Sequence, residues 1–120
     1  MLSIFLKAKL HNLTITSAEL NYQGSMTLDP DFMEAVGMVE FEKILIANLE
    51  NGNRFETYAI AGERGSRVCC LNGATAHKGA VGDRVIVFSF CMLNDSEIAN
   101  HKPRIAIFGA ENEMLRESRI

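Results

Sequence analysis

The chain has 120 residues, 48% of them hydrophobic and 22% charged, and its net charge is −3. This length suits a single domain with a thin core, and the apolar excess favours an additional subunit interface. A negative net charge without runs of like charge argues against nucleic-acid binding. The apolar start is too short for a signal sequence, and no stretch is long enough to span a membrane. Three cysteines without a CxxC pattern indicate reduced thiols and no metal site, so we expect a cytoplasmic protein.

The first half of the chain is predicted to form strands around one short helix. An extended segment over residues 9–16 is followed by Asp29, Pro30 and Gly37, which are typical of the N-cap, the first turn and the position after the end of a helix. Strands are then expected over residues 42–49 and 54–61, joined by a two-residue hairpin turn at Asn51-Gly52.

The second half is predicted to add three further strands, over residues 68–71, 84–92 and 104–108, with turns at Asn72-Gly73 and Val81-Gly82-Asp83 and a polar tail at 113–120. The strand at 84–92 is apolar on both faces, so we expect it to lie centrally. Many short strands with little helix predict a mainly β fold, most simply a closed barrel, although the pattern does not identify which barrel.

The dipeptide Gly24-Ser25 has the minimum parts for cleavage of the chain by itself. A serine hydroxyl can attack the carbonyl carbon of the preceding peptide bond, and glycine permits the backbone conformation that this attack needs. The plainer interpretation of the same dipeptide is a surface turn.

Other residues are suited to binding a dicarboxylic substrate. Arg54 offers a planar fork for a carboxylate, and Lys9 is a second cation. Arg54 and Tyr58 project from one face of a strand about 13 Å apart, whereas Thr57 projects from the other face. The small residues after Asn72 allow backbone N–H groups to approach a ligand closely. Taken singly, each residue has an ordinary structural role.

Together these residues resemble the pyruvoyl-dependent aspartate 1-decarboxylases over nearly the whole chain. The shared blocks occur in order at Lys9-Leu10-His11, Tyr22-x-Gly24-Ser25, Asn51-Gly52-x-Arg54-Phe55-x-Thr57-Tyr58, Glu63-Arg64-Gly65-Ser66, Asn72-Gly73-Ala74, Val81-Gly82-Asp83 and Asn112-Glu113. The chain departs from the family pattern at Asn21, at Thr75, where the family usually has alanine, at Lys78 and at the Cys69-Cys70 pair. His77 has no metal-ligand spacing and is interpreted as structural.

The resemblance implies a six-stranded double-psi β-barrel with short helices, formed as a single domain by residues 1–120. It also implies a homotetrameric lyase that converts L-aspartate to β-alanine and CO2 through a Schiff base, in pantothenate and coenzyme A biosynthesis. The precursor would cut itself between Gly24 and Ser25 into a β chain (residues 1–24) and an α chain (residues 25–120), and Ser25 would become the covalent pyruvoyl cofactor.

The resemblance further implies a role for each site residue. Thr57 supports self-cleavage, Tyr58 returns the proton after CO2 leaves, and Lys9 lies near the substrate and the pyruvoyl group. The implied substrate-binding residues are Arg54, Thr57, Asn72, Gly73, Ala74, Thr75 and Lys9.

Three alternatives remain open on the sequence. One is a barrel that binds a partner but has lost the chemistry. Another is a pyruvoyl decarboxylase that acts on a different amino acid. The third is a thiol enzyme that uses Cys69, Cys70 or Cys91, although no Cys-His signature supports it and their apolar neighbours suggest inert thiols.

Overall fold

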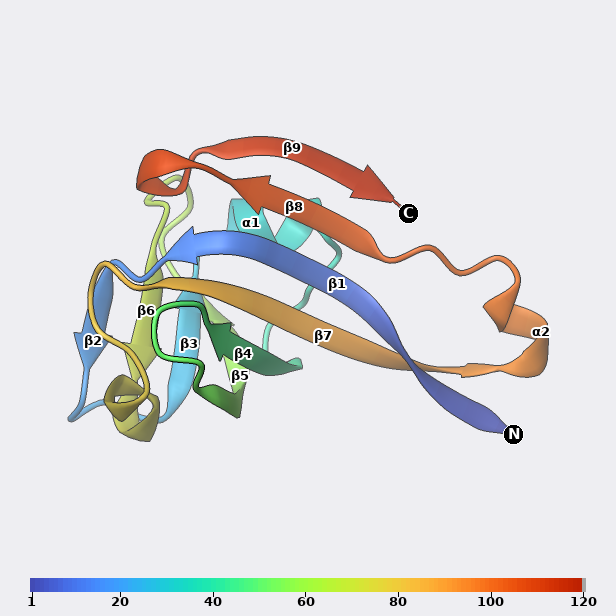
Figure 1. The fold of residues 1–120 in the computed structure, drawn as a ribbon, viewed down its shortest axis with the longest axis horizontal. Coiled ribbons are helices and arrows are strands. Elements are labelled where there is room, and N and C mark those ends of the chain that lie inside the picture. Colours follow the sequence, from blue (N-terminus) through green and yellow to red (C-terminus); the bar gives the residue numbers. More distant parts are fainter. Residues whose placement is uncertain (120) are drawn as a thin grey trace.

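The computed structural model describes residues 1–119 of the chain as nine strands with four short helices (Figure 1). In chain order the elements are β1 (Leu2–Thr14), β2 (Ser17–Glu19), β3 (Ser25–Leu28), α1 (Pro30–Ala35), β4 (Lys43–Asn48), β5 (Arg54–Ala61), β6 (Cys69–Asn72), the 3-10 helix η1 (Gly73–His77), β7 (Arg84–Asn94), α2 (Asp95–Ile98), β8 (Arg104–Phe108), the 3-10 helix η2 (Ala110–Asn112) and β9 (Met114–Arg119). No helix in the described part is long and apolar enough to cross a membrane.

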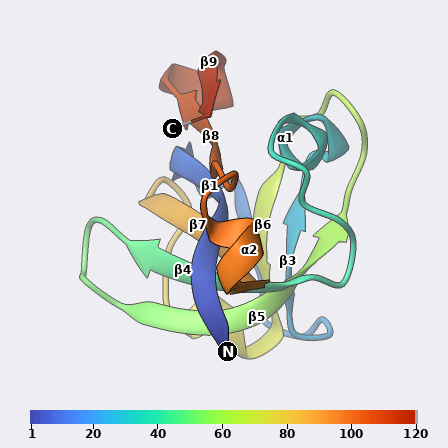
Figure 2. The same ribbon diagram turned by 90° about the vertical axis from the view of Figure 1, so that its right-hand side faces the viewer.

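The strands form one sheet in the order β2-β6-β3-β5-β4-β7-β1-β8-β9. The pairs β1–β8, β2–β6 and β3–β5 are parallel, and the other pairs are antiparallel. Seen from the α2 end, β5 curves beneath β1 toward β3, and β8 and β9 lie at the top of the view (Figure 2). The expected mainly β class is confirmed, with nine strands in place of the six that the resemblance implied.

Alternation along the strands separates a buried face from an outer face. In β7, Val85 and Val87 are fully buried, whereas Ile86 and Phe88 are half-buried on the opposite face. β7 lies between β4 and β1, as expected from its apolar faces. Beyond the first residues of β4, the start of β1 and the last residues of β7 continue as a two-stranded arm that ends near α2 (Figure 1).

The predicted helix is present as α1, with Asp29 as its N-cap. The Asp29 carboxylate accepts a hydrogen bond from the Asp31 backbone N–H at 2.9 Å, and Gly37 follows the helix with a φ of +70°. The same carboxylate accepts from the Gly65 and Arg67 backbone N–H groups. Asp29 therefore also joins the helix to the loop that precedes β6.

Three local expectations were wrong. The expected two-residue turn at Asn51-Gly52 is a longer connection over residues 49–53. The Asn48 backbone N–H donates to the Asn53 carbonyl oxygen across this connection, and Gly52, with a φ of +75°, is one of the residues within it. Asn72-Gly73 is not a hairpin turn: the chain continues from it into η1. The tail expected at 113–120 forms β9 over its described part, because β8 offers an edge on which it pairs antiparallel; Ile120 lies outside the described residues.

Candidate active site

Ser25 and Asn72 face each other at the ends of two paired strands. Ser25 is the first residue of β3 and lies opposite Asn72, the last residue of β6. Ser25 is only 1% exposed. The Asn72 side-chain amide donates to Ser25 Oγ with an Nδ2–Oγ distance of 3.0 Å, and the Ser25 hydroxyl donates to the Gln23 carbonyl oxygen at 3.4 Å. The hydroxyl is therefore buried, oriented and turned toward the backbone that precedes it.

Gly73 brings the backbone of η1 against the peptide that precedes Ser25. A Cβ atom on Gly73 would lie 2.8 Å from both the N and Cα atoms of Gly24 and 2.8 Å from the Tyr22 carbonyl oxygen. Gly73 also has a φ of +64°, which L side chains rarely adopt. Glycine is thus required here twice, once for the close approach and once for the conformation.

The hydroxyl of Thr75 also lies in this cluster. Thr75 is buried, and its Oγ1 lies 2.7 Å from the Asn72 carbonyl oxygen and 3.4 Å from the Ser25 carbonyl oxygen. The preceding residue, Ala74, is exposed on η1. The departure from the usual alanine at position 75 therefore adds a polar contact to Ser25.

Lys9 and Arg54 meet on the ring of Phe88. Lys9 Nζ lies 5.7 Å from the centroid of this ring and Arg54 Cζ lies 5.8 Å from it. Lys9 in β1 is directly paired with Phe88 in β7, whereas Arg54 reaches it from β5. The ring attracts both cations through its negative face, so it holds two positive charges on one patch of the outer sheet face.

His11 lies two residues beyond Lys9, at a bulge in the pairing of β1 with β7. Its Nδ1 atom is buried and has no hydrogen-bond partner among residues 1–119. Burial, and then the charge of Lys9, hold the pKa of His11 below its ordinary value. The ring therefore favours the neutral form, which can donate or accept a hydrogen bond.

Thr57 and Tyr58 lie on opposite faces of β5, as predicted. Thr57 pairs with Ile44, which belongs to the core, and Met26 pairs with Ala59. β3 and β5 are parallel, Thr57 lies two residues before Ala59, and Gly24 lies two residues before Met26. Thr57 therefore lies at the end of β5 that is beside the cleavage site. Tyr58 is exposed on the outer face.

The Tyr58 ring packs 6.3 Å from the ring of Phe41. Within residues 1–119 no hydrogen bond or ion pair links the cluster around Ser25 with Lys9, Arg54 or Tyr58. The structure of one chain thus assembles two groups of site residues: one around the Gly24–Ser25 peptide and one on the outer sheet face.

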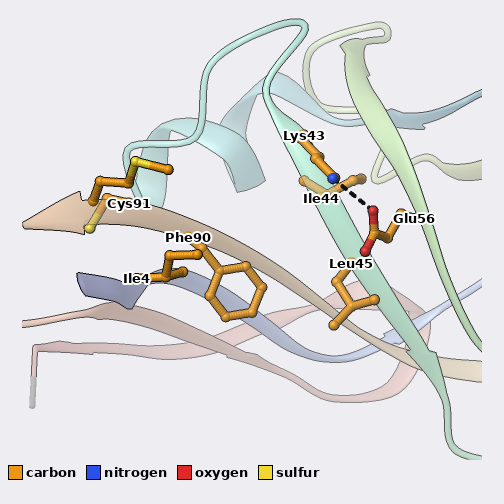
Figure 3. Close-up of a pocket in the computed structure, with 8 residues that line it drawn as sticks. Ile4, Lys43, Ile44, Leu45, Glu56, Phe90 and Cys91 are labelled. Carbon is orange, nitrogen blue, oxygen red and sulfur yellow. Dashed lines mark ion pairs between the residues drawn. The ribbon is translucent and has the colours of Figure 1, made fainter. Parts of the chain in front are cut away.

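A separate apolar groove of about 400 Å³ lies on the outer face where the arm leaves β4. Figure 3 shows Ile4 and Phe90 on one side of it, and Leu45 with the Lys43–Glu56 ion pair, which has an N–O distance of 2.8 Å, on the other. No group of three potential metal ligands occurs in the described part of the chain.

Comparison with known proteins identifies the family. Residues 1–115 match the sequence profile described as aspartate decarboxylase. This chain belongs to the aspartate decarboxylase family. Relatives include the aspartate 1-decarboxylases of Tolumonas auensis, 51% identical over 99% of this chain and 94% of the relative, and of Psychromonas ingrahamii, 50% identical with the same coverage. The aspartate 1-decarboxylase of Caldicellulosiruptor bescii is 50% identical over 94% of this chain and 88% of its own length.

Sequence reasoning missed three residues that contact the two groups: Phe88, Thr27 and Cys70. Phe88 was assigned only to a central strand, because its contact with two cations depends on pairing between distant strands. Thr27 and Cys70 both form hydrogen bonds with the side-chain amide of Asn72. Their alternation with Ser25 and Asn72 was the available signal, since residues two apart on a strand share a face.

Proposed function

We propose that this chain is a self-processing aspartate 1-decarboxylase that works in the cytoplasm and supplies β-alanine for pantothenate and coenzyme A biosynthesis. Membership of the aspartate decarboxylase family supports the reaction. The buried contact between Asn72 Nδ2 and Ser25 Oγ, beside the close approach of Gly73 to Gly24, is the observation that carries the self-processing step.

In this step Ser25 Oγ attacks the carbonyl carbon of Gly24 and the amide becomes an ester. Elimination across Ser25 then releases the new carboxyl group of Gly24, which leaves dehydroalanine at position 25. Hydrolysis of dehydroalanine releases ammonia and leaves a ketone. Asn72 holds the attacking oxygen, Gly73 fixes the peptide that is attacked, and Thr57 supports the negative charge that develops on the carbonyl oxygen.

The surroundings of Ser25 fit the pyruvoyl group that would form there. The position is buried, so a ketone at residue 25 would be shielded from bulk water. The Thr75 hydroxyl lies close to the carbonyl oxygen of the same residue, which the pyruvoyl group retains. When formed, the ketone accepts the electrons that decarboxylation of an amino acid releases.

The residues on the outer sheet face bind and protonate the substrate. Arg54 and Lys9 bind the carboxylates of aspartate, with Phe88 holding both side chains in place, and Tyr58 returns a proton to the carbon that lost CO2. Asn72, Gly73, Ala74 and Thr75 line the other side of the substrate. Since no hydrogen bond or ion pair joins these two groups within residues 1–119 of one chain, we propose that neighbouring subunits of a homotetramer combine them in one pocket.

The exposed side chains of the arm support such an assembly. The arm presents four exposed apolar residues, Leu2, Ile4, Phe90 and Met92. Three of these residues also line the apolar groove of Figure 3. A patch of this kind is typical of a surface that another protein covers.

The deciding experiment compares the wild-type chain with Ser25→Ala by intact mass under denaturing conditions and by assay of CO2 and β-alanine. We expect two fragments divided between residues 24 and 25 in the wild type, the larger one without an N-terminal amine, and only the full chain in the variant. Activity should appear with aspartate and not with glutamate. An intact, inactive wild-type chain after prolonged heating would contradict self-processing, and activity with glutamate in place of aspartate would contradict the substrate.

A further inference from the structure

Cys70 contacts the side chain that holds the reactive serine. Cys70 and Asn72 are two apart on β6 and share a face. The Cys70 thiol donates to Asn72 Oδ1 with an Sγ–Oδ1 distance of 3.3 Å, and Cys70 is only 6% exposed. A thiol is a weak donor, but here it serves a buried amide oxygen that water does not reach.

The nitrogen of the Asn72 amide donates both of its hydrogens. Its Nδ2 atom donates to Ser25 Oγ at 3.0 Å and to Thr27 Oγ1 at 2.8 Å. The Ser25 hydroxyl donates its hydrogen to the Gln23 carbonyl oxygen, so toward Asn72 the Ser25 Oγ atom can only accept a hydrogen bond. This requires the nitrogen of the Asn72 amide, and not its oxygen, to face Ser25. The amide is therefore held in one orientation by three side chains on two strands, since Thr27 and Cys70 are themselves cross-strand partners.

We propose that Cys70 is a positioning residue for self-cleavage: its thiol holds the Asn72 amide with the nitrogen toward Ser25. Without it, Asn72 Oδ1 is a buried acceptor with no donor, and rotation of the amide toward any other donor withdraws the nitrogen from Ser25 Oγ. This inference rests on the proposed self-processing of Ser25. It gives a role to a residue that departs from the family pattern.

The test follows disappearance of the freshly synthesised full chain, by intact mass at fixed temperature, in the wild type, Cys70→Ala and Cys70→Ser. Loss of one weak hydrogen bond to a buried amide should slow cleavage about 3- to 10-fold in Cys70→Ala. Serine restores a donor at the same place, so Cys70→Ser should cleave within about twofold of the wild-type rate. A residue that only filled space would give the opposite order, because alanine is tolerated in an apolar site better than serine.

Cys69 supplies the matched control. It is the adjacent thiol, fully buried on the opposite face of the same strand, where it belongs to the core. Cys69→Ala and Cys69→Ser should lower the thermal midpoint, with serine the more damaging, and leave the cleavage rate of the folded chain unchanged. If Cys70→Ala does not fold, Cys70→Val, which retains the volume, takes its place and is expected to be slow.

Two results would overturn the inference. One is wild-type cleavage rates in Cys70→Ala or Cys70→Val. The other is a cleavage rate in Cys70→Ser that is as slow as in Cys70→Ala while both variants keep the wild-type thermal midpoint. A wild-type chain that never cleaves would instead contradict the proposed function itself, so the two failures are distinguishable.

Discussion

Gly73 lies against the backbone of Gly24, with no room for a side chain between them. The contact joins η1 to the peptide that precedes Ser25, although the two glycines are far apart in the sequence. It follows directly after Asn72, so two adjacent residues contact Ser25 Oγ and the Gly24 backbone. The position of this loop therefore controls the geometry of self-cleavage.

Gly73→Ala should stop or strongly slow cleavage, because its Cβ would fall 2.8 Å from Gly24 and the loop must withdraw. The matched control is Gly52→Ala, which has a similar positive φ of +75° but open space around it. Both variants carry about 1–2 kcal/mol of backbone strain. Equal cleavage in the two variants, measured by intact mass, would mean that the close approach is irrelevant.

Phe88→Leu should weaken aspartate binding without changing self-cleavage. The ring attracts both Lys9 and Arg54, and each exposed cation–π contact contributes about 0.5–1 kcal/mol, so loss of both should raise KM about 5- to 30-fold. Phe5→Leu, which removes a ring from the same strand pair far from both cations, is the control. An unchanged KM in Phe88→Leu would show that the ring does not position the cations.

Asn48→Ala should destabilise the protein and lower activity. Asn48 is buried and donates to the Lys78 carbonyl oxygen at 3.2 Å and to Asp83 Oδ2 at 3.0 Å, which joins the end of η1 to the hairpin that carries Arg54. Its loss removes these two hydrogen bonds and the one that Asn48 Oδ1 accepts from the Glu50 backbone N–H, at about 1–3 kcal/mol in urea unfolding. Asn53→Ala removes a bond to the same Lys78 oxygen from outside the core, and should cost less. Equal losses would contradict this ranking.

His11 should make the folded protein less stable as the pH falls. Its folded pKa lies below the ordinary value of 6.5 because burial and Lys9 disfavour the charged ring. The unfolded chain therefore binds more protons between the folded pKa and 6.5, and stability decreases as the pH falls through that window.

The measurement for His11 is the free energy of unfolding in urea at about pH 7.5 and about pH 5.5, in the wild type and in His11→Gln. The wild type should lose more stability than the variant. Hydrogen-bonded carboxylates at Glu34, Glu50 and Asp83 have lowered pKa values, so their contribution is lost only at more acidic pH. Parallel losses in the two proteins would contradict the prediction.

Alkylation of the native protein should modify Cys91 and leave Cys69 and Cys70 unmodified. Burial, and then the neighbouring Cys70, raise the pKa of Cys69 to about 12, and both residues are buried, whereas Cys91 is half-buried. Peptide mass mapping after brief iodoacetamide treatment checks this, with the urea-unfolded chain as the control. Activity should survive the modification, and loss of activity with Cys91 alkylated and the oligomeric state unchanged would revive the thiol-enzyme alternative.

The sequence predicted most of the local structure. The helix after Asp29 and the strand over residues 54–61 were correct, because capping residues and alternation act over a few neighbouring positions. It failed at Asn72-Gly73, where an Asn-Gly pair that is typical of hairpins begins η1 instead. A tertiary contact overrides the local preference for a turn: Gly73 packs against Gly24, which is far away in the sequence and therefore in no local pattern.

The sequence by itself determined the mainly β class, the family and the residue types that carry the chemistry, because these are properties of alternation, turn residues and ordered motifs. Only the tertiary structure decided which of these residues meet. Ser25 contacts Asn72, and Lys9 and Arg54 both contact the Phe88 ring, because strands far apart in the chain are paired. Burial and register, which fix hydrogen-bond partners and pKa values, exist only after those strands have paired.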